Sequence, residues 1–291
     1  MSLIRNILIF VLLISISCKR TSGGRIVTKS GIEIHFHELS GSTKKVFKSS
    51  FINVDMTVSD KNNEIIFSSN FNGLHGVSSF YYDSLLADSP FNEVFLKIFA
   101  GDSVSLKVES KDFFHSFFGK AISFKALNST DSILLRLKVL DYSTAKEQQK
   151  IINKLSSLAH NYEINELNRV KREWDKKYMN IFKLDNLYAI KLASDKILNS
   201  VNDSSENYIS INYSIESLDG RLLYNTGIKP EYYDKSLNGQ LLEGFKIIID
   251  NYIKGDSIMA ILPSDLVFGK RGSFVNQIPP YSPVKINLRI N

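Results

Sequence analysis

The sequence predicts an α+β protein with two strand-rich domains joined by a long helical segment. Alternation of apolar and polar residues, typical of half-buried strands, dominates residues 27–142 and 184–291. Residues 143–183 instead contain no glycine or proline and carry apolar residues at helical spacing. Each strand-rich part also contains a short apolar helix that ends in Gly-Asp-Ser, at 101–103 and 255–257, so we expect a tandem duplication.

The composition is that of a folded protein with a mild positive charge. Its 291 residues suit two domains of ordinary size. Hydrophobic residues make up 43% and charged residues 23%, which argues against an intrinsically disordered chain. The formal net charge of +6 suits an anionic membrane surface but is also common in soluble domains. Basic residues form no long block and do not interleave with aromatic residues, so no nucleic-acid partner is expected.

Residues 1–17 have the pattern of an export signal. Arg5 precedes an uninterrupted apolar run that is too short to span a bilayer and fits a signal-peptide core. Cys18, the only cysteine of the chain, follows, and this arrangement resembles a bacterial lipoprotein signal. The resemblance implies lipidation of Cys18, with residues 18–26 as a polar tether to the membrane. An ordinary signal peptide is the alternative, since Ile16 stands where lipoprotein signals usually have a small residue.

The first domain is predicted to span residues 27–142. Its strands are expected within 31–39, 50–60, 65–69, 103–108 and 131–141, with a short helix before the Gly-Asp-Ser turn. His35 and His37 share one strand face, as two metal ligands would, but no third ligand is apparent. We therefore interpret both as exposed strand residues.

The helical segment, residues 143–183, is expected to form one long helix or two consecutive ones. Its apolar residues recur at helical spacing from Ile151 to Ala159 and from Leu167 to Ile181. Its basic residues are interpreted as a solvated face. They are Lys150, Lys154, Arg169, Lys171, Arg172, Lys176 and Lys177.

The second domain, residues 184–291, begins with a predicted hairpin around Asp219-Gly220, a strong turn signal. A helix follows within 239–254, with Leu242, Phe245, Ile249 and Tyr252 on one face. Gly255 ends that helix. The last two strands are expected within 257–262 and 284–290.

Five short motifs of this domain have the spacing of a known family. They are Asp219-Gly220, Leu242-Glu243-Gly244-Phe245, Gly255-Asp256, Ile261-Leu262-Pro263-Ser264 with Phe268-Gly269, and Ile278-Pro279-Pro280. Residues 187–291 thereby resemble the FKBP-type peptidyl-prolyl cis-trans isomerases. The resemblance implies an antiparallel sheet wrapped around one short helix, with an apolar pocket between them. Residues 27–142 resemble a degenerate second copy, and the whole plan is similar to envelope isomerase lipoproteins of Bacteroidota, some of them associated with gliding motility.

The reaction that the resemblance implies needs no reactive side chain. Rotation about the planar X–Pro amide has a barrier of ~18–20 kcal/mol. The twisted transition state has lost the amide resonance and is less dipolar, so an apolar, water-poor pocket favours it over the ground state. We therefore expect no metal, no cofactor, no nucleophile and no acid–base pair.

The resemblance also implies which residues form the pocket. Those expected to act on the substrate bond are Tyr213, Phe245, Phe268 and the backbone N–H of Leu242. Those expected to line the binding site are Leu223, Tyr224, Tyr232, Leu241, Ile278 and Ile286. Phe245 corresponds to the aromatic floor, usually Trp in the family, and Tyr232 to an aromatic wall.

Two departures from the family pattern reduce the polar contacts of this pocket. Tyr224 stands where the family has an aspartate, so the pocket carboxylate is predicted to be missing. Phe268 stands where the family has a tyrosine, so a hydroxyl that contacts substrate is missing. In the first copy, Met56 replaces the strand tyrosine and Ile66-Phe67 replace the Phe-Asp pair, so that copy is expected to be inactive.

Two functions remain open at this point, and a third possibility combines them, with the first domain and the helix holding unfolded chains and the second domain isomerising them. The first is a peptidyl-prolyl isomerase that helps envelope or exported proteins to fold, with proline-containing polypeptides as clients. The second is a non-catalytic, lipid-anchored binding subunit of an envelope secretion or motility complex. In both, the expected location is the cell envelope, on the outer membrane and facing the periplasm.

Overall fold

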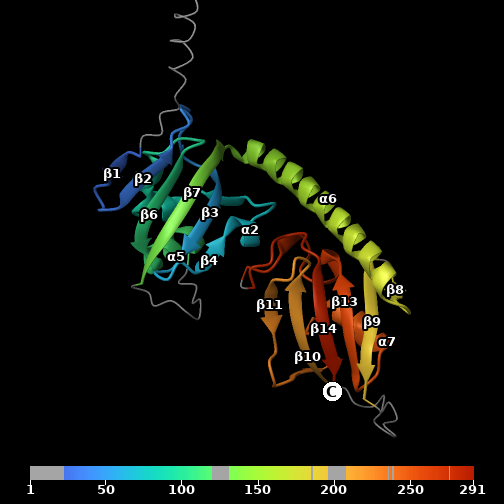
Figure 1. Cartoon of the computed structure of the whole chain (residues 1–291). Coiled ribbons are helices and arrows are strands. Elements are labelled where there is room, and N and C mark those ends of the chain that lie inside the picture. Colours follow the sequence, from blue (N-terminus) through green and yellow to red (C-terminus); the bar gives the residue numbers. More distant parts are fainter. Residues whose placement is uncertain are drawn as a thin grey trace, which may run out of the picture. The chain divides into compact units, whose positions relative to one another are not determined.

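The computed structural model describes residues 23–119, 131–184, 186–195, 208–234, 236–237, 239–274 and 276–291. Here the chain forms two compact units (Figure 1). One consists of residues up to 66 together with 79–145, and the other of 67–78 together with 146–291. The predicted signal peptide and Cys18 lie outside the described residues. No helix among the described residues has the length and apolarity needed to cross a membrane.

The first sheet has seven strands in the order β1-β2-β6-β7-β3-β4, with β5 paired to β3. The strands are β1 (Arg25–Val27), β2 (Glu33–Glu38), β3 (Phe51–Ser59), β4 (Ile65–Ser68), β5 (Ser78–Tyr81), β6 (Ser103–Glu109) and β7 (Ser132–Ser143). The short helices are α2 (Ser69–Asn72), α3 (Ser84–Ala87), α4 (Phe91–Phe95) and α5 (Ser110–Phe118), of which α2 groups with the second unit.

The second sheet also has seven strands, in the order β11-β10-β14-β13-β9-β8, with β12 paired to β10. The strands are β8 (Phe182–Leu184), β9 (Leu187–Ser194), β10 (Tyr208–Ser217), β11 (Leu222–Asn225), β12 (Glu231–Asp234), β13 (Asp256–Leu262) and β14 (Val284–Ile290). The helices are α7 (Glu243–Asn251) and two single 3-10 turns, η1 (Ser264–Leu266) and η2 (Gly269–Arg271).

The two sheets have the same topology. Reading the second sheet from β8 gives β8-β9-β13-β14-β10-β11, which matches β1-β2-β6-β7-β3-β4 strand for strand. The additional strand pairs with the equivalent partner in each, β5 with β3 and β12 with β10. The α+β class with two repeated domains is therefore confirmed, and the shared topology is what a duplication predicts.

The Gly-Asp-Ser turns are built alike in both units. Asp102 is 2% exposed and accepts hydrogen bonds from the Phe99 N–H and from the Ser40 hydroxyl. Asp256 is 1% exposed and accepts from the Ile253 N–H and from the Ser194 hydroxyl. In each turn the buried carboxylate accepts a hydrogen bond from the N–H three residues earlier and another from the hydroxyl of a serine in a different segment.

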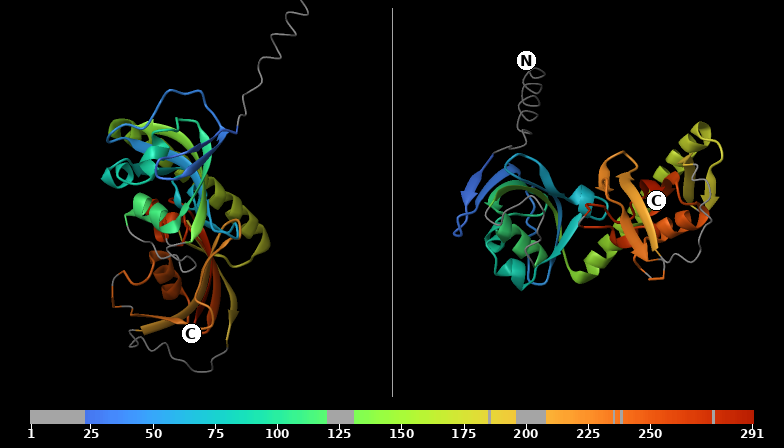
Figure 2. Two further views of the ribbon diagram at one scale, coloured as in Figure 1. Left: turned by 90° about the vertical axis from the view of Figure 1, so that its left-hand side faces the viewer. Right: turned by 90° about the horizontal axis from the view of Figure 1, so that it is seen from below.

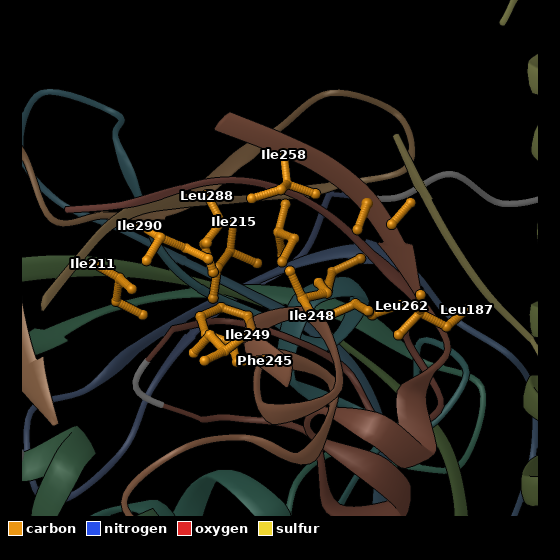
Figure 3. Close-up of a cluster of buried hydrophobic side chains, with 14 of the residues drawn as sticks. Leu187, Ile211, Ile215, Phe245, Ile248, Ile249, Ile258, Leu262, Leu288 and Ile290 are labelled. Carbon is orange, nitrogen blue, oxygen red and sulfur yellow. The ribbon is translucent and has the colours of Figure 1, made fainter. Parts of the chain in front are cut away.

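The core of the second unit lies between the inner face of its sheet and α7. Alternate strand residues point into it because successive strand side chains face opposite sides. Figure 3 shows Phe245, Ile248 and Ile249 of α7 facing these side chains. The buried strand members are Leu187, Ala189, Ile209, Ile211, Ile215, Ile258, Ala260, Leu262, Val284, Ile286, Leu288 and Ile290.

The long helix α6 (Ala145–Lys177) is one continuous helix (Figures 1 and 2). Leu167, Val170 and Trp174 on its second half pack against Ile190 and Ile261, which point away from the α7 side of the sheet. The sheet of the second unit is therefore covered by α7 on one face and by α6 on the other.

Buried polar contacts also join α6 to this sheet. The carboxylate of Glu163, which is 4% exposed, accepts hydrogen bonds from the N–H and the hydroxyl of Ser264 at 2.6 and 3.0 Å. Lys171 is 8% exposed, donates to the Asn186 side chain at 2.9 Å and lies over the Tyr188 ring. The prediction of a solvated basic face is therefore wrong for Lys171, whereas the other six basic residues are exposed.

Candidate functional site

The N-terminal end of α7 places Phe245 beneath the sheet. Leu242, with an extended backbone, is the N-cap, and its C=O accepts hydrogen bonds from the N–H groups of Phe245 and Lys246. Phe245 is 2% exposed. The Tyr213 ring stands almost perpendicular to it, at 85°, with a ring-centre distance of 4.9 Å. This is the edge-to-face geometry that aromatic pairs prefer.

Seven further predicted site residues are gathered around Phe245. Six of them pack on the core cluster while keeping part of their surface exposed: Tyr213, Leu223, Tyr224, Leu241, Leu242 and Phe268. The seventh, Ile286, is fully buried in the same cluster. We call this group, together with Phe245, the aromatic cluster.

Two predicted site residues lie elsewhere. Ile278 is 1% exposed but is not a member of the core cluster that contains Phe245. Its N–H and C=O pair with Ser273, and this pair closes the loop before Pro279. Tyr232 is 73% exposed, so its prediction as a pocket wall is wrong.

The register of β12 explains why Tyr232 lies outside. Glu231 and Tyr233 lie opposite Ile211 and Ile209 of β10, and both isoleucines are buried in the core. Residues directly opposite in an antiparallel pair share one face. Glu231 and Tyr233 therefore face the aromatic cluster, and Tyr232, between them, faces solvent. The alternation of residues in the stretch Pro-Glu-Tyr-Tyr-Asp predicts a strand with two different faces. Because two tyrosines are adjacent, the sequence does not show which of them faces the core.

A carboxylate is present in the site after all, and it comes from Glu231. Its Oε2 accepts hydrogen bonds from the hydroxyls of Tyr213, at 3.0 Å, and of Tyr233. Its Oε1 accepts from the Tyr224 hydroxyl. The Tyr213 and Tyr233 hydroxyls also lie 3.2 Å apart. The predicted loss of the pocket carboxylate is thus correct for position 224 but wrong for the site.

These hydrogen bonds fix the charge state of the cluster. Burial raises the pKa of Glu231, but the three tyrosine hydroxyls outweigh it and hold the pKa below its usual range. Burial and the carboxylate raise the pKa of Tyr233 to about 12. Burial, Tyr233 and Glu231 also raise the pKa of Tyr213 above its usual range. The hydrogen bond to Glu231 also raises the pKa of Tyr224. At neutral pH the site therefore holds one carboxylate anion and three protonated hydroxyls.

The equivalent positions of the first sheet lack these polar groups. The strand registers align Met56 with Tyr213, because Met56 lies opposite Leu137 and Tyr213 lies opposite the corresponding Leu288. Met56 is 1% exposed and Phe67, which stands at the position of Tyr224, is 2% exposed. Neither side chain has a hydroxyl or a carboxylate, so this face of the first sheet is apolar at both positions.

The two histidines of β2 each contact another side chain. The ring of His35 contacts the Glu33 carboxylate at 2.6 Å, and His37 shares a hydrogen bond of 2.9 Å with the Ser105 hydroxyl. Among the described residues, no three His, Cys, Asp or Glu side chains come together as metal ligands would.

Comparisons with known proteins found likenesses among solved structures only. No protein-family model and no curated protein matches the sequence. The chain is similar to a peptidyl-prolyl cis-trans isomerase from Pseudomonas syringae pv. tomato, at 15% identity over 46% of this chain and 92% of that one, with a TM-score of 0.38. It is similar to the three FKBP domains of wheat FKBP73, at 12% identity over 90% and 94%, with a TM-score of 0.32. It is also similar to FkpA from Escherichia coli, at 18% identity over 50% and 67%, with a TM-score of 0.38.

Proposed function

We propose that the second unit binds proline-containing segments of polypeptides and catalyses their cis–trans isomerisation in the manner of an FKBP. The observation that carries this proposal is the aromatic cluster. Phe245 forms a buried floor, Tyr213 stands edge-on against it, and partly exposed apolar side chains surround both. A proline ring seated there loses water on one face, which disfavours the planar dipolar amide relative to the twisted transition state.

The backbone at the start of α7 supplies a polar contact for the substrate. The N–H of Leu242 donates to no acceptor among the described residues. N–H groups at a helix N-terminus have no partner within the helix and attract acceptors. A substrate carbonyl bound there would be held while the amide rotates over Phe245.

An isomerase assay tests this proposal directly. The purified full chain is added to a peptide with one X–Pro bond, and exchange between its cis and trans forms is followed by NMR. Uncatalysed exchange takes tens to hundreds of seconds. We expect a clear acceleration that rises with protein concentration. A folded chain that gives only the uncatalysed rate would contradict the proposal.

A non-catalytic binding module is the second candidate. Phe268 keeps the apolar surface of the cluster but lacks the hydroxyl found in the family, and the first unit has no polar group at the equivalent of Tyr213. A chain that binds proline peptides at the aromatic cluster without accelerating exchange would favour this candidate. Isolation of a stable stoichiometric partner from solubilised membranes would then identify the complex.

We further propose that the protein is a lipid-anchored folding helper of the cell envelope, on the outer membrane and facing the periplasm. The support is the apolar run of residues 7–16 that precedes Cys18. Cells fed a clickable fatty acid should incorporate it into the wild-type protein and not into the Cys18→Ser variant. Label that persists in the variant would contradict anchoring through Cys18. As a control, the Cys18→Ser variant should appear in the soluble envelope fraction, which would show that it is still exported.

A further inference from the structure

The Glu231 carboxylate is a negative charge that no described cation neutralises. Its hydrogen-bond partners are the hydroxyls of Tyr213, Tyr224 and Tyr233. It forms no salt bridge with any lysine, arginine or histidine in the described part of the chain. All three hydroxyls are neutral donors, so the full charge remains beside the aromatic cluster.

One hydrogen-bonding position of this carboxylate remains for a ligand. An ionised carboxylate can accept about four hydrogen bonds, two on each oxygen. Oε2 accepts two, from Tyr213 and Tyr233, whereas Oε1 accepts one, from Tyr224. Glu231 is itself only partly buried. A hydrogen-bond donor on a bound peptide could therefore supply the second hydrogen bond that Oε1 accepts.

We infer that Glu231 determines which prolines the site accepts, favouring a lysine or arginine next to the proline and disfavouring an aspartate or glutamate. The inference rests on the proposed function. A neutral side chain of the same shape would suffice to hold the three hydroxyls, whereas only a charge distinguishes Lys-Pro from Glu-Pro. Glu231 is thus a specificity-determining residue, separate from the apolar surface that accelerates rotation.

The expected size of the effect follows from Coulomb attraction at a partly buried site. The Coulomb energy between the carboxylate and a unit charge about 4 Å away lies between its value in water and its value near a protein surface. An energy in this range changes the binding constant roughly tenfold, upward for a cation and downward for an anion. Salt screens such an interaction only partly when one of the groups is partly buried. We therefore expect the preference to weaken, without disappearing, at high ionic strength.

The test compares peptides that differ only in the residue beside proline. Two series carry lysine, leucine or glutamate, one before and one after the proline. Both kcat/KM for isomerisation and Kd, from fluorescence anisotropy of labelled peptides, are measured for the full-length wild type and Glu231→Gln. Glu216→Gln is the matched control, because it removes the same charge from the opposite face of β10, where Glu216 pairs with Lys285.

The wild type and Glu216→Gln should prefer lysine over leucine peptides, and leucine over glutamate peptides, by about tenfold each, and Glu231→Gln should reduce both ratios to between one and two. A purely structural role of Glu231 would instead weaken all peptides alike and leave the ratios unchanged, which would overturn the inference. A wild type that binds with this preference but does not accelerate exchange would overturn the proposed catalysis and keep the inference. If no peptide binds at all, both fail.

Discussion

Replacing Phe245 by alanine is expected to lower the free energy of unfolding of the second unit by about 3–5 kcal/mol. The ring is 2% exposed and contacts the core cluster and the Tyr213 ring. Its removal would leave a cavity beneath the sheet that the surrounding strands cannot close. Urea unfolding, followed by circular dichroism, measures this loss. A loss below about 1 kcal/mol would show that the site collapses and that Phe245 is not a rigid floor.

A milder pair of variants separates the stability of this core from its activity. Phe245→Leu keeps an apolar side chain and most of its volume and should cost about 1.5 kcal/mol, far less than Phe245→Ala. Ile248→Val, on the same helix and fully buried, should cost about 0.5–1.5 kcal/mol. The two variants are therefore similarly stable, but only Phe245→Leu removes the aromatic face below the proposed proline site. We expect it to reduce kcat/KM at least tenfold while Ile248→Val stays near the wild type; equal losses would place the activity elsewhere.

The elements with strong local signals were predictable from the sequence. The Asp219-Gly220 hairpin and the last strand lie where periodicity and turn residues place them, and α7 lies within its predicted range. Its predicted end at Gly255 is wrong, because α7 ends at Asn251 and Tyr252 already has an extended backbone. The duplication was also visible, because the Gly-Asp-Ser turn recurs. Helix α5, by contrast, was not predicted: its phenylalanines recur at helical spacing, but nine residues give that pattern only one repeat.

The features that were missed depend on contacts between segments distant in the sequence. Lys171 resembles any other basic residue of α6, and only the packing of this helix on β9 buries it. Glu231 lies 18 residues from Tyr213, and the sequence does not show which phase of a four-residue strand faces inward. The pairing of β12 with β10 decides that phase, so the carboxylate of the site could be found only in three dimensions.

Asp256 should have the second largest effect on stability, although it takes no part in the proposed site. Its buried carboxylate accepts hydrogen bonds from the Ser194 hydroxyl at 2.6 Å and from the Ile253 N–H at 3.2 Å. Lys191 also contacts it at 3.2 Å, but this lysine is half exposed and can return to water. Asp256→Ala leaves the hydroxyl and the N–H without an acceptor, and each unsatisfied group costs about 1–3 kcal/mol. We expect a total loss of about 3 kcal/mol in urea unfolding.

The pH dependence of the stability loss shows whether the negative charge of the Asp256 carboxylate causes it. Burial raises the pKa of Asp256, but the hydrogen bonds from Ser194, Ile253 and Lys191 outweigh it and hold the pKa below its usual range. A carboxyl whose pKa is lowered on folding stabilises the protein above its unfolded pKa of about 3.9. That contribution is lost as the pH falls through the folded pKa.

The variant Asp256→Asn keeps the shape but does not titrate, so its deficit relative to the wild type should be largest at pH 6–7 and shrink toward pH 3. The exposed Asp265→Asn is the control, expected within about 0.5 kcal/mol of the wild type. A deficit that stays constant down to pH 3 would show that geometry, not charge, holds the turn. Asp102 of the first unit accepts hydrogen bonds of the same kind, from the Phe99 N–H and the Ser40 hydroxyl, so Asp102→Ala should likewise lower the free energy of unfolding of that unit. Matching results would show that the duplication preserved the turn that both folds need while the residues around Tyr213 diverged.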